Sequence, residues 1–95
     1  MLKKGTQVAY IPNHANGDIN HPDVEYGFIF NVVQTGYREN DITYFCRFWQ
    51  KGKPGILRTV SNSEKCFDYQ LAEHMTVGNN VVDNALEIIR AANRQ

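Results

Sequence analysis

The segment 42–49, ITYFCRFW, carries apolar side chains at every second position: Ile42, Tyr44, Cys46 and Phe48. A period of two is typical of a β-strand with one buried face. The same alternation recurs over 6–11, where Val8 and Tyr10 share a face, and over 26–34. In the segment 26–34, Phe28, Phe30 and Val32 share one predicted face, and Ile29 and Val33 share the other. Short alternating runs of this kind predict a sheet.

Turn-forming residues divide these runs at short intervals. The segments 35–41 and 50–55 contain Gly with Asn and Asp or with Pro, which are typical of turns. They leave a short fourth strand at 56–60, a single helical turn at 67–71 and a fifth strand at 73–77. A long loop after the first strand and a helical turn before the last predict a mainly β fold, a small five-stranded SH3-like barrel. We assign this barrel to residues 1–78.

Residues 79–95 have the periodicity of a helix. Apolar residues recur on one predicted stripe: Val82, Ala85, Leu86, Ile89 and Ala92. If undocked, this stripe would expose a contiguous apolar surface. We expect it to cover either the open end of the barrel or a second copy of the chain, which would form a homodimer through the C-terminal helix.

Charge and composition exclude several classes of function. The 95 residues include ten Lys or Arg and ten Asp or Glu, so no excess of positive charge favours phosphate binding. No apolar run approaches the about 20 residues that a membrane span needs. Met1–Thr6 is not followed by the apolar core of a secretory signal. We therefore expect a cytoplasmic protein with no membrane partner, in which Cys46 and Cys66 are reduced and unbridged.

The stretch HANGDINHPDVEYG, which begins at His14, has two histidines and three carboxylates but few apolar residues. Asn, Asp and Gly satisfy a turn by themselves, so a self-sufficient polar loop is one interpretation. His14 and His21, with Asp18, Asp23 or Glu25, also offer ligand types that transition metals accept, although their spacing matches no defined zinc signature. No nucleophile accompanies the histidines. We expect no enzyme, and assign no catalytic residue, metal ligand or cofactor.

The N-terminal half also contains a specific pattern. It reads Gly-x-x-Val-x-Tyr-x-Pro-x-His-Ala, then Gly-Asp, then His-Pro-Asp-x-Glu-x-Gly, between Gly5 and Gly27. This pattern resembles a family of small uncharacterised proteins from phages and prophages, and Arg47 and Phe48 match a later strand of that family. The resemblance covers the second half of the chain only loosely and does not extend to the terminal helix. It implies a phage or prophage origin and an SH3-like barrel, and it implies no established activity.

The first loop and the aromatic residues near it predict a surface for a partner. We assign to this surface Tyr10, His14, Asp18, His21, Asp23, Glu25, Tyr26 and Trp49. The acids suit a basic partner, and the rings resemble the flat platforms of peptide-binding grooves. We expect a host protein as the partner, such as a defence component that the phage protein would inhibit. The alternative is a nucleic-acid or nucleotide binder, in which Lys51, Lys53 and Arg58 contact phosphate beside exposed rings.

A turn made only for connection needs no ionisable residues, so those of this loop require a reason. We expect His14, Asp18, His21 and Glu25 to form one hydrogen-bonded cluster at the base of the loop. Carboxylates orient imidazole rings and favour their protonated form, and the cluster would fix the shape of the loop. It would then present Asp23 and the neighbouring tyrosines to a partner.

Overall fold

The computed structural model describes residues 2–38, 41–58, 63–74 and 78–94. Its elements, with η for a 3-10 helix, are β1 (Gln7–Tyr10), η1 (Asn13–Ala15), β2 (Glu25–Gln34), β3 (Ile42–Gln50), β4 (Lys53–Leu57), β5 (Glu64–Phe67), η2 (Asp68–Gln70), β6 (Leu71–Glu73) and α1 (Asn79–Asn93). The fold is mainly β with one C-terminal α-helix, as predicted. Positions 59–60 and 75–77 of the predicted fourth and fifth strands lie outside the described residues. Over the described ranges, no helix combines the length and the apolar character that crossing a membrane requires.

The strands form an open antiparallel sheet in the order β4-β3-β2-β1-β6, and β5 also pairs with β3. The described residues thus form six strands, and the prediction of five overlooked β5, whose four residues are too short for a clear alternation. Leu57 of β4 pairs with Trp49, and Glu64 of β5 pairs with Cys46, so both strands follow the same edge of β3. The sheet is not a closed barrel, because no described pairing joins β6 to β4 or β5.

A β-bulge in β2 decides which of its residues face which side of the sheet. Ile29 and Asn31 pair with consecutive residues of β3, so Phe30 between them has no opposite residue. One extra residue reverses the alternation beyond it. Val32 therefore packs in the same cluster as Ile29, whereas Phe28 and Phe30 pack together on the other side. The prediction that Val32 shares a face with these two phenylalanines is wrong.

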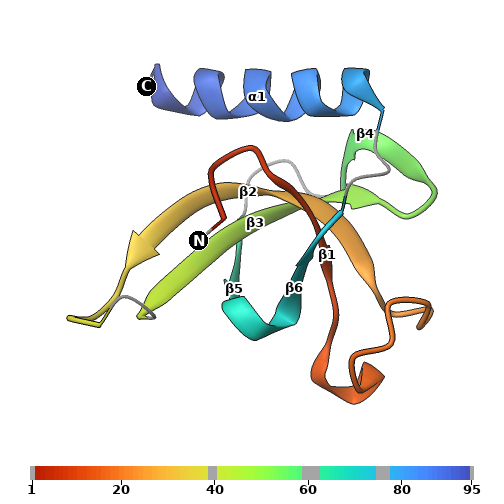
Figure 1. Cartoon of the computed structure of the whole chain (residues 1–95). Coiled ribbons are helices and arrows are strands. Elements are labelled where there is room, and N and C mark those ends of the chain that lie inside the picture. The colour runs from red at the N-terminus through yellow and green to blue at the C-terminus, as the bar shows by residue number, and fades with distance from the viewer. Residues whose placement is uncertain (1, 39–40, 59–62, 75–77, 95) are drawn as a thin grey trace.

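Hydrophobic clusters cover both sides of the sheet. The interior cluster contains the buried residues Val8, Ile29, Tyr44, Cys46, Phe48 and Cys66, with Tyr10 and Ile42 packed against it. This membership confirms the faces predicted for 6–11 and 42–49. The helix cluster joins Phe28 and Trp49 of the sheet to Ala85 and Ile89 of α1. Figure 1 shows α1 lying along one side of the sheet, with the loop that carries η1 at the far end of the molecule.

The apolar stripe of α1 is covered largely by the chain's own sheet. Ala85 and Ile89 are buried, and Leu86 is half-buried beside Gly5, where an added Cβ would lie 2.9 Å from a methyl of Leu86. The predicted stripe is wrong at its end, because Ala92 is exposed. Because the buried part of the stripe packs against the sheet of the same chain, the stripe gives no reason to expect a homodimer through this helix.

The two cysteines, Cys46 and Cys66, are buried free thiols within the interior cluster. A hydrogen bond between them, together with burial, raises the pKa of the Cys46 thiol. Because the two side chains are at most 1% exposed, we expect neither thiol to be alkylated at a measurable rate by iodoacetamide in the folded protein. Both should react in concentrated guanidinium chloride, as read from the intact mass. A native mass lower by two hydrogens would contradict this prediction, since it would indicate a disulfide.

Candidate functional site

A groove with a volume of about 920 Å³ lies between the β1–β2 loop and the turn from β3 to β4. This volume falls within the range of about 300–1,000 Å³ that is usual for ligand sites. Seven of the eight residues predicted to bind a partner line this binding groove: Tyr10, His14, His21, Asp23, Glu25, Tyr26 and Trp49. Asp18 is not among the lining residues. The sequence thus identifies most of one wall of the groove.

The β1–β2 loop holds its shape through its own backbone. Successive turns are closed by N–H groups that donate to carbonyl oxygens three residues earlier, at Ala15, Asn16, Asp18, His21 and Val24. Gly17 has a φ of +78°, which glycine adopts without strain. Ala15 and Val24 are buried, so each end of the loop is anchored in the protein. The loop is therefore a built structure, and its side chains have defined positions.

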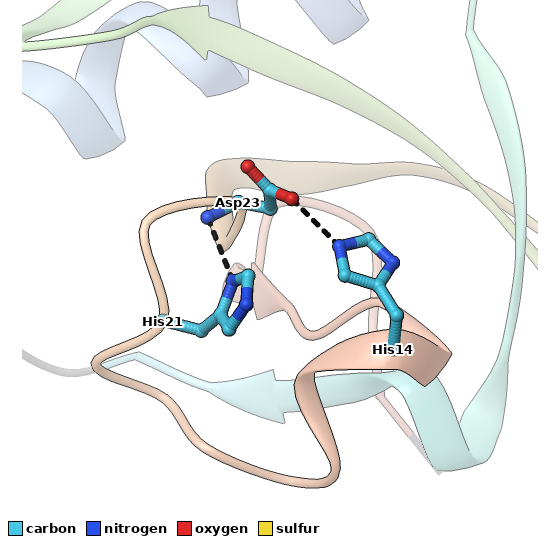
Figure 2. A group of neighbouring side chains, drawn as sticks. All are labelled: His14, His21 and Asp23. Atoms are coloured by element: carbon cyan, nitrogen blue, oxygen red, sulfur yellow. Dashed lines mark hydrogen bonds and ion pairs between the residues drawn. The ribbon is translucent and has the colours of Figure 1, made fainter.

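Three side chains of this loop converge, and we call them the His–Asp cluster: His14, His21 and Asp23 (Figure 2). Nε2 of His14 and Oδ2 of Asp23 are 2.6 Å apart, and this bond lowers the pKa of the Asp23 carboxyl below its usual value. The backbone N–H of Asp23 donates to Nδ1 of His21 over 3.0 Å. The two imidazole rings meet edge to face, with centroids 5.2 Å apart.

The predicted cluster is therefore correct in its histidines and wrong in its acids. Oδ1 of Asp18 accepts the backbone N–H of Asn20 over 2.9 Å, a local turn contact that takes Asp18 away from the rings. Glu25 lies at the start of β2, where it forms an ion pair with Arg58. Asp23, expected to face a partner, is the acid that bonds His14.

Arg58 pairs with acids from two strands and so links the predicted acidic and basic surfaces. Its guanidinium forms ion pairs with Glu25 of β2 and with Glu64 of β5, and it lies over the ring of Phe48 with its centre 5.5 Å from the ring centroid. One acid of the expected acidic surface is thus neutralised by one cation of the expected basic hairpin. Lys51 lines the same groove and donates from Nζ to the carbonyl oxygen of Pro22 over 3.2 Å.

The aromatic residues of the groove have unequal roles. Tyr26 is 40% exposed, and its ring lies edge to face with His74 at 4.7 Å. Trp49 is only 4% exposed, packs against Phe28 in the helix cluster, and donates from Nε1 to Oε1 of Gln7. The prediction of Trp49 as part of an exposed platform is therefore wrong, since its ring belongs to the core. Among Tyr10, Tyr26 and Trp49, which all line the groove, Tyr26 is the most exposed.

Several lining residues were not recognised from the sequence. They include the prolines at 12, 22 and 54, together with Ile19 and His74. Pro12, Pro22 and Ile19 belong to the β1–β2 loop, whose histidines and acids drew attention in the sequence rather than its apolar residues. His74 follows β6 and reaches the groove only because β6 pairs with β1. No local pattern around His74 could have indicated this long-range neighbour.

The lining combines apolar surface with balanced charge. Asp23 and Glu25 are matched in number by Lys51 and Arg58, and the described lining residues include no Ser, Thr or Cys that could act as a nucleophile. Such a surface can hold an extended segment through apolar contact and hydrogen bonds. The chain matches no protein-family model, no curated protein and no solved structure. The groove's own residues are therefore the basis for assigning a function.

Proposed function

We propose that the protein is a non-enzymatic module that binds a segment of another protein in the binding groove. The observation that carries this proposal is the convergence of seven predicted residues on one groove of suitable volume. The strand order β6-β1-β2-β3, with η2 before the last strand, supports an SH3-like arrangement. The resemblance to phage proteins supports a cytoplasmic host protein as the partner, whose activity the module would block.

The lining of the groove favours a partner segment with aromatic or apolar side chains. Tyr26 and Ile19 are 40% and 41% exposed, so each offers apolar surface that a ligand can cover. Arg58 and Glu25 already neutralise each other, and long-range charge contributes little to such binding. The internal hydrogen bonds of the loop fix the groove in advance, which lowers the entropic cost of binding.

The test uses peptides selected from a random library on the immobilised protein, with affinity measured by fluorescence anisotropy. We expect Tyr26→Ala to weaken binding of the selected peptides by about tenfold or more, since a central aromatic residue is typical of binding hot spots. Raising the salt from low to physiological concentration should change the affinity by less than about threefold, because few ions are released. Both results would support a groove that binds through apolar contact.

Tyr69→Ala is the matched control. Tyr69 is 73% exposed and is not among the groove residues. Its replacement removes an exposed tyrosine without touching the groove, so peptide affinity should stay at the wild-type value. Equal losses in both variants would contradict the proposal, because the peptides would then not be bound in the groove.

One observation favours the nucleic-acid alternative at a different place. The rings of Phe67 and Tyr69 are parallel, and their centroids lie 5.9 Å apart. Nζ of Lys65 lies 5.8 Å from the centroid of the Phe67 ring. Exposed rings beside a cation can stack on bases. A single-stranded oligonucleotide that binds with a steep, log-linear salt dependence, and loses affinity in Tyr69→Ala but not in Tyr26→Ala, would establish this alternative.

A further inference from the structure

We propose that the His–Asp cluster is a binding site for a divalent transition metal ion, with zinc as the best match. Each of His14, His21 and Asp23 offers one ligand atom, and these three atoms all lie within 4.8 Å of one another. Zinc binds imidazole nitrogen and carboxylate oxygen at about 2.0–2.2 Å, which places tetrahedral ligands about 3.4 Å apart. Side-chain rotations that move the three atoms by about an ångström would therefore enclose an ion.

The backbone supports all three ligands before any ion binds. His14 lies in η1, directly before the buried Ala15. The His21 N–H donates to the carbonyl oxygen of Asp18 over 3.1 Å, and Asp23 directly precedes the buried Val24. Sites whose ligands are held in place bind metals without paying the full entropy of ordering a loop.

The contacts of the cluster also favour metal binding over a simple ion pair. The His14–Asp23 pair is exposed, at 61% and 59% of the two side chains, and such exposed pairs contribute little to the stability of the fold. That pair does not need a second imidazole 5.2 Å from the first. Nδ1 of His21 accepts the Asp23 N–H, so this nitrogen carries no proton and has a lone pair facing Asp23. An ion would replace that N–H, which is exposed and can bond water instead.

The position of the cluster leaves part of the coordination sphere open. All three ligands line the binding groove, and both His14 and Asp23 are exposed. Three protein ligands with a free fourth position are typical of zinc sites that accept water or a ligand. This inference does not depend on the proposed peptide function, because the ion binds the chain alone.

The experiment is a titration of EDTA-treated protein with ZnCl₂. Binding is measured by calorimetry and by the shifts of the ring resonances of the three histidines in NMR spectra. We expect one ion per chain, with the His14 and His21 rings shifting together while the His74 ring stays in place. Asp23→Asn and His21→Gln should each weaken binding by about tenfold or more, because each removes a ligand. Both changes lie in an exposed loop and should leave the melting temperature of the metal-free protein within a few degrees of the wild type.

Two matched controls keep the inference falsifiable. Asp18→Asn removes a neighbouring carboxylate of the same loop but keeps an oxygen for the Asn20 N–H, and His74→Gln removes the third histidine of the groove. Both should bind zinc with wild-type affinity. If Asp18→Asn weakened zinc binding as much as Asp23→Asn, the ion would only be attracted to the acids of the loop in general, and the proposed site would be wrong. No heat and no ring shift in the wild type would overturn the proposal, whatever the peptide experiments give.

Discussion

Replacing Ile89 by Asp is expected to lower the melting temperature by about 10–20 °C or more, or to leave the chain unfolded at room temperature. Ile89 is only 7% exposed, and its side chain completes the helix cluster with Phe28, Trp49 and Ala85. Loss of a buried isoleucine side chain costs about 2–5 kcal/mol, and an unpaired carboxylate in its place adds to that cost. Small domains have only about 5–15 kcal/mol of stability. Thermal and urea unfolding followed by circular dichroism would measure the loss.

Ala92→Asp is the control for this prediction, because it adds the same charge to the exposed face one turn further along α1. Its effect on the free energy of unfolding should stay at about 1 kcal/mol, from the lower helix propensity of Asp and its charge in the last turn of the helix. Light scattering should give the same mass for the wild type and for folded variants. An Ile89→Asp protein with an unchanged melting curve but a smaller mass would contradict the packing of α1 on its own sheet and place Ile89 between two chains.

Replacing Gly27 by Ala should destabilise the protein by about 3 kcal/mol, at the upper end of what overpacking costs. Gly27 pairs with Phe48 across β2 and β3. A Cβ at this position would overlap the carbonyl oxygen of Arg47 and lie 2.9 Å from Cα of Phe48. The added Cβ would also lie 2.8 Å from Cδ1 of the buried Phe48 ring, but the nearest atom is a backbone oxygen. No side-chain rotation can relieve that overlap, so the two strands must separate locally. Urea unfolding would give the change in free energy directly.

Gly78→Ala separates this steric effect from the general effect of replacing glycine. Gly78 precedes α1 with φ of −70°, and an added Cβ there has no atom within 4 Å. Alanine is a poorer N-cap than glycine, so we expect a loss of about 1 kcal/mol, well below the loss expected for Gly27→Ala. A Gly27→Ala protein as stable as Gly78→Ala would show that β2 and β3 are further apart than the structure places them.

The features of the fold that could be predicted depend on local periodicity. The shared face of Ile42, Tyr44, Cys46 and Phe48 follows from uninterrupted alternation within one strand, and the structure confirms it. The face of Val32 could not be predicted in this way, since the bulge at Phe30 is set by the pairing of β2 with β3. Nothing local distinguishes a bulged residue from a paired one.

The same limit applies to the candidate site. The sequence indicates the first loop because ionisable residues gather there, but it does not show which acid reaches His14. Asp18, Asp23 and Glu25 are all close to the histidines along the chain, and only contacts elsewhere separate them. Glu25 is taken by Arg58, which lies 33 residues away, and Asp18 by a backbone N–H of its own turn. These choices depend on tertiary structure.

Strand β2 runs from the binding groove at Glu25 and Tyr26 directly into residues that serve both hydrophobic clusters. Phe28 belongs to the helix cluster and the adjacent Ile29 to the interior cluster, so neither cluster can open without disturbing this strand. The two clusters are therefore expected to unfold as one cooperative unit. A ligand that holds the groove end of β2 shifts the equilibrium of this whole unit towards the native state. Occupancy of the groove is thus thermodynamically linked to global stability, and the melting transition reports on whether the groove is occupied.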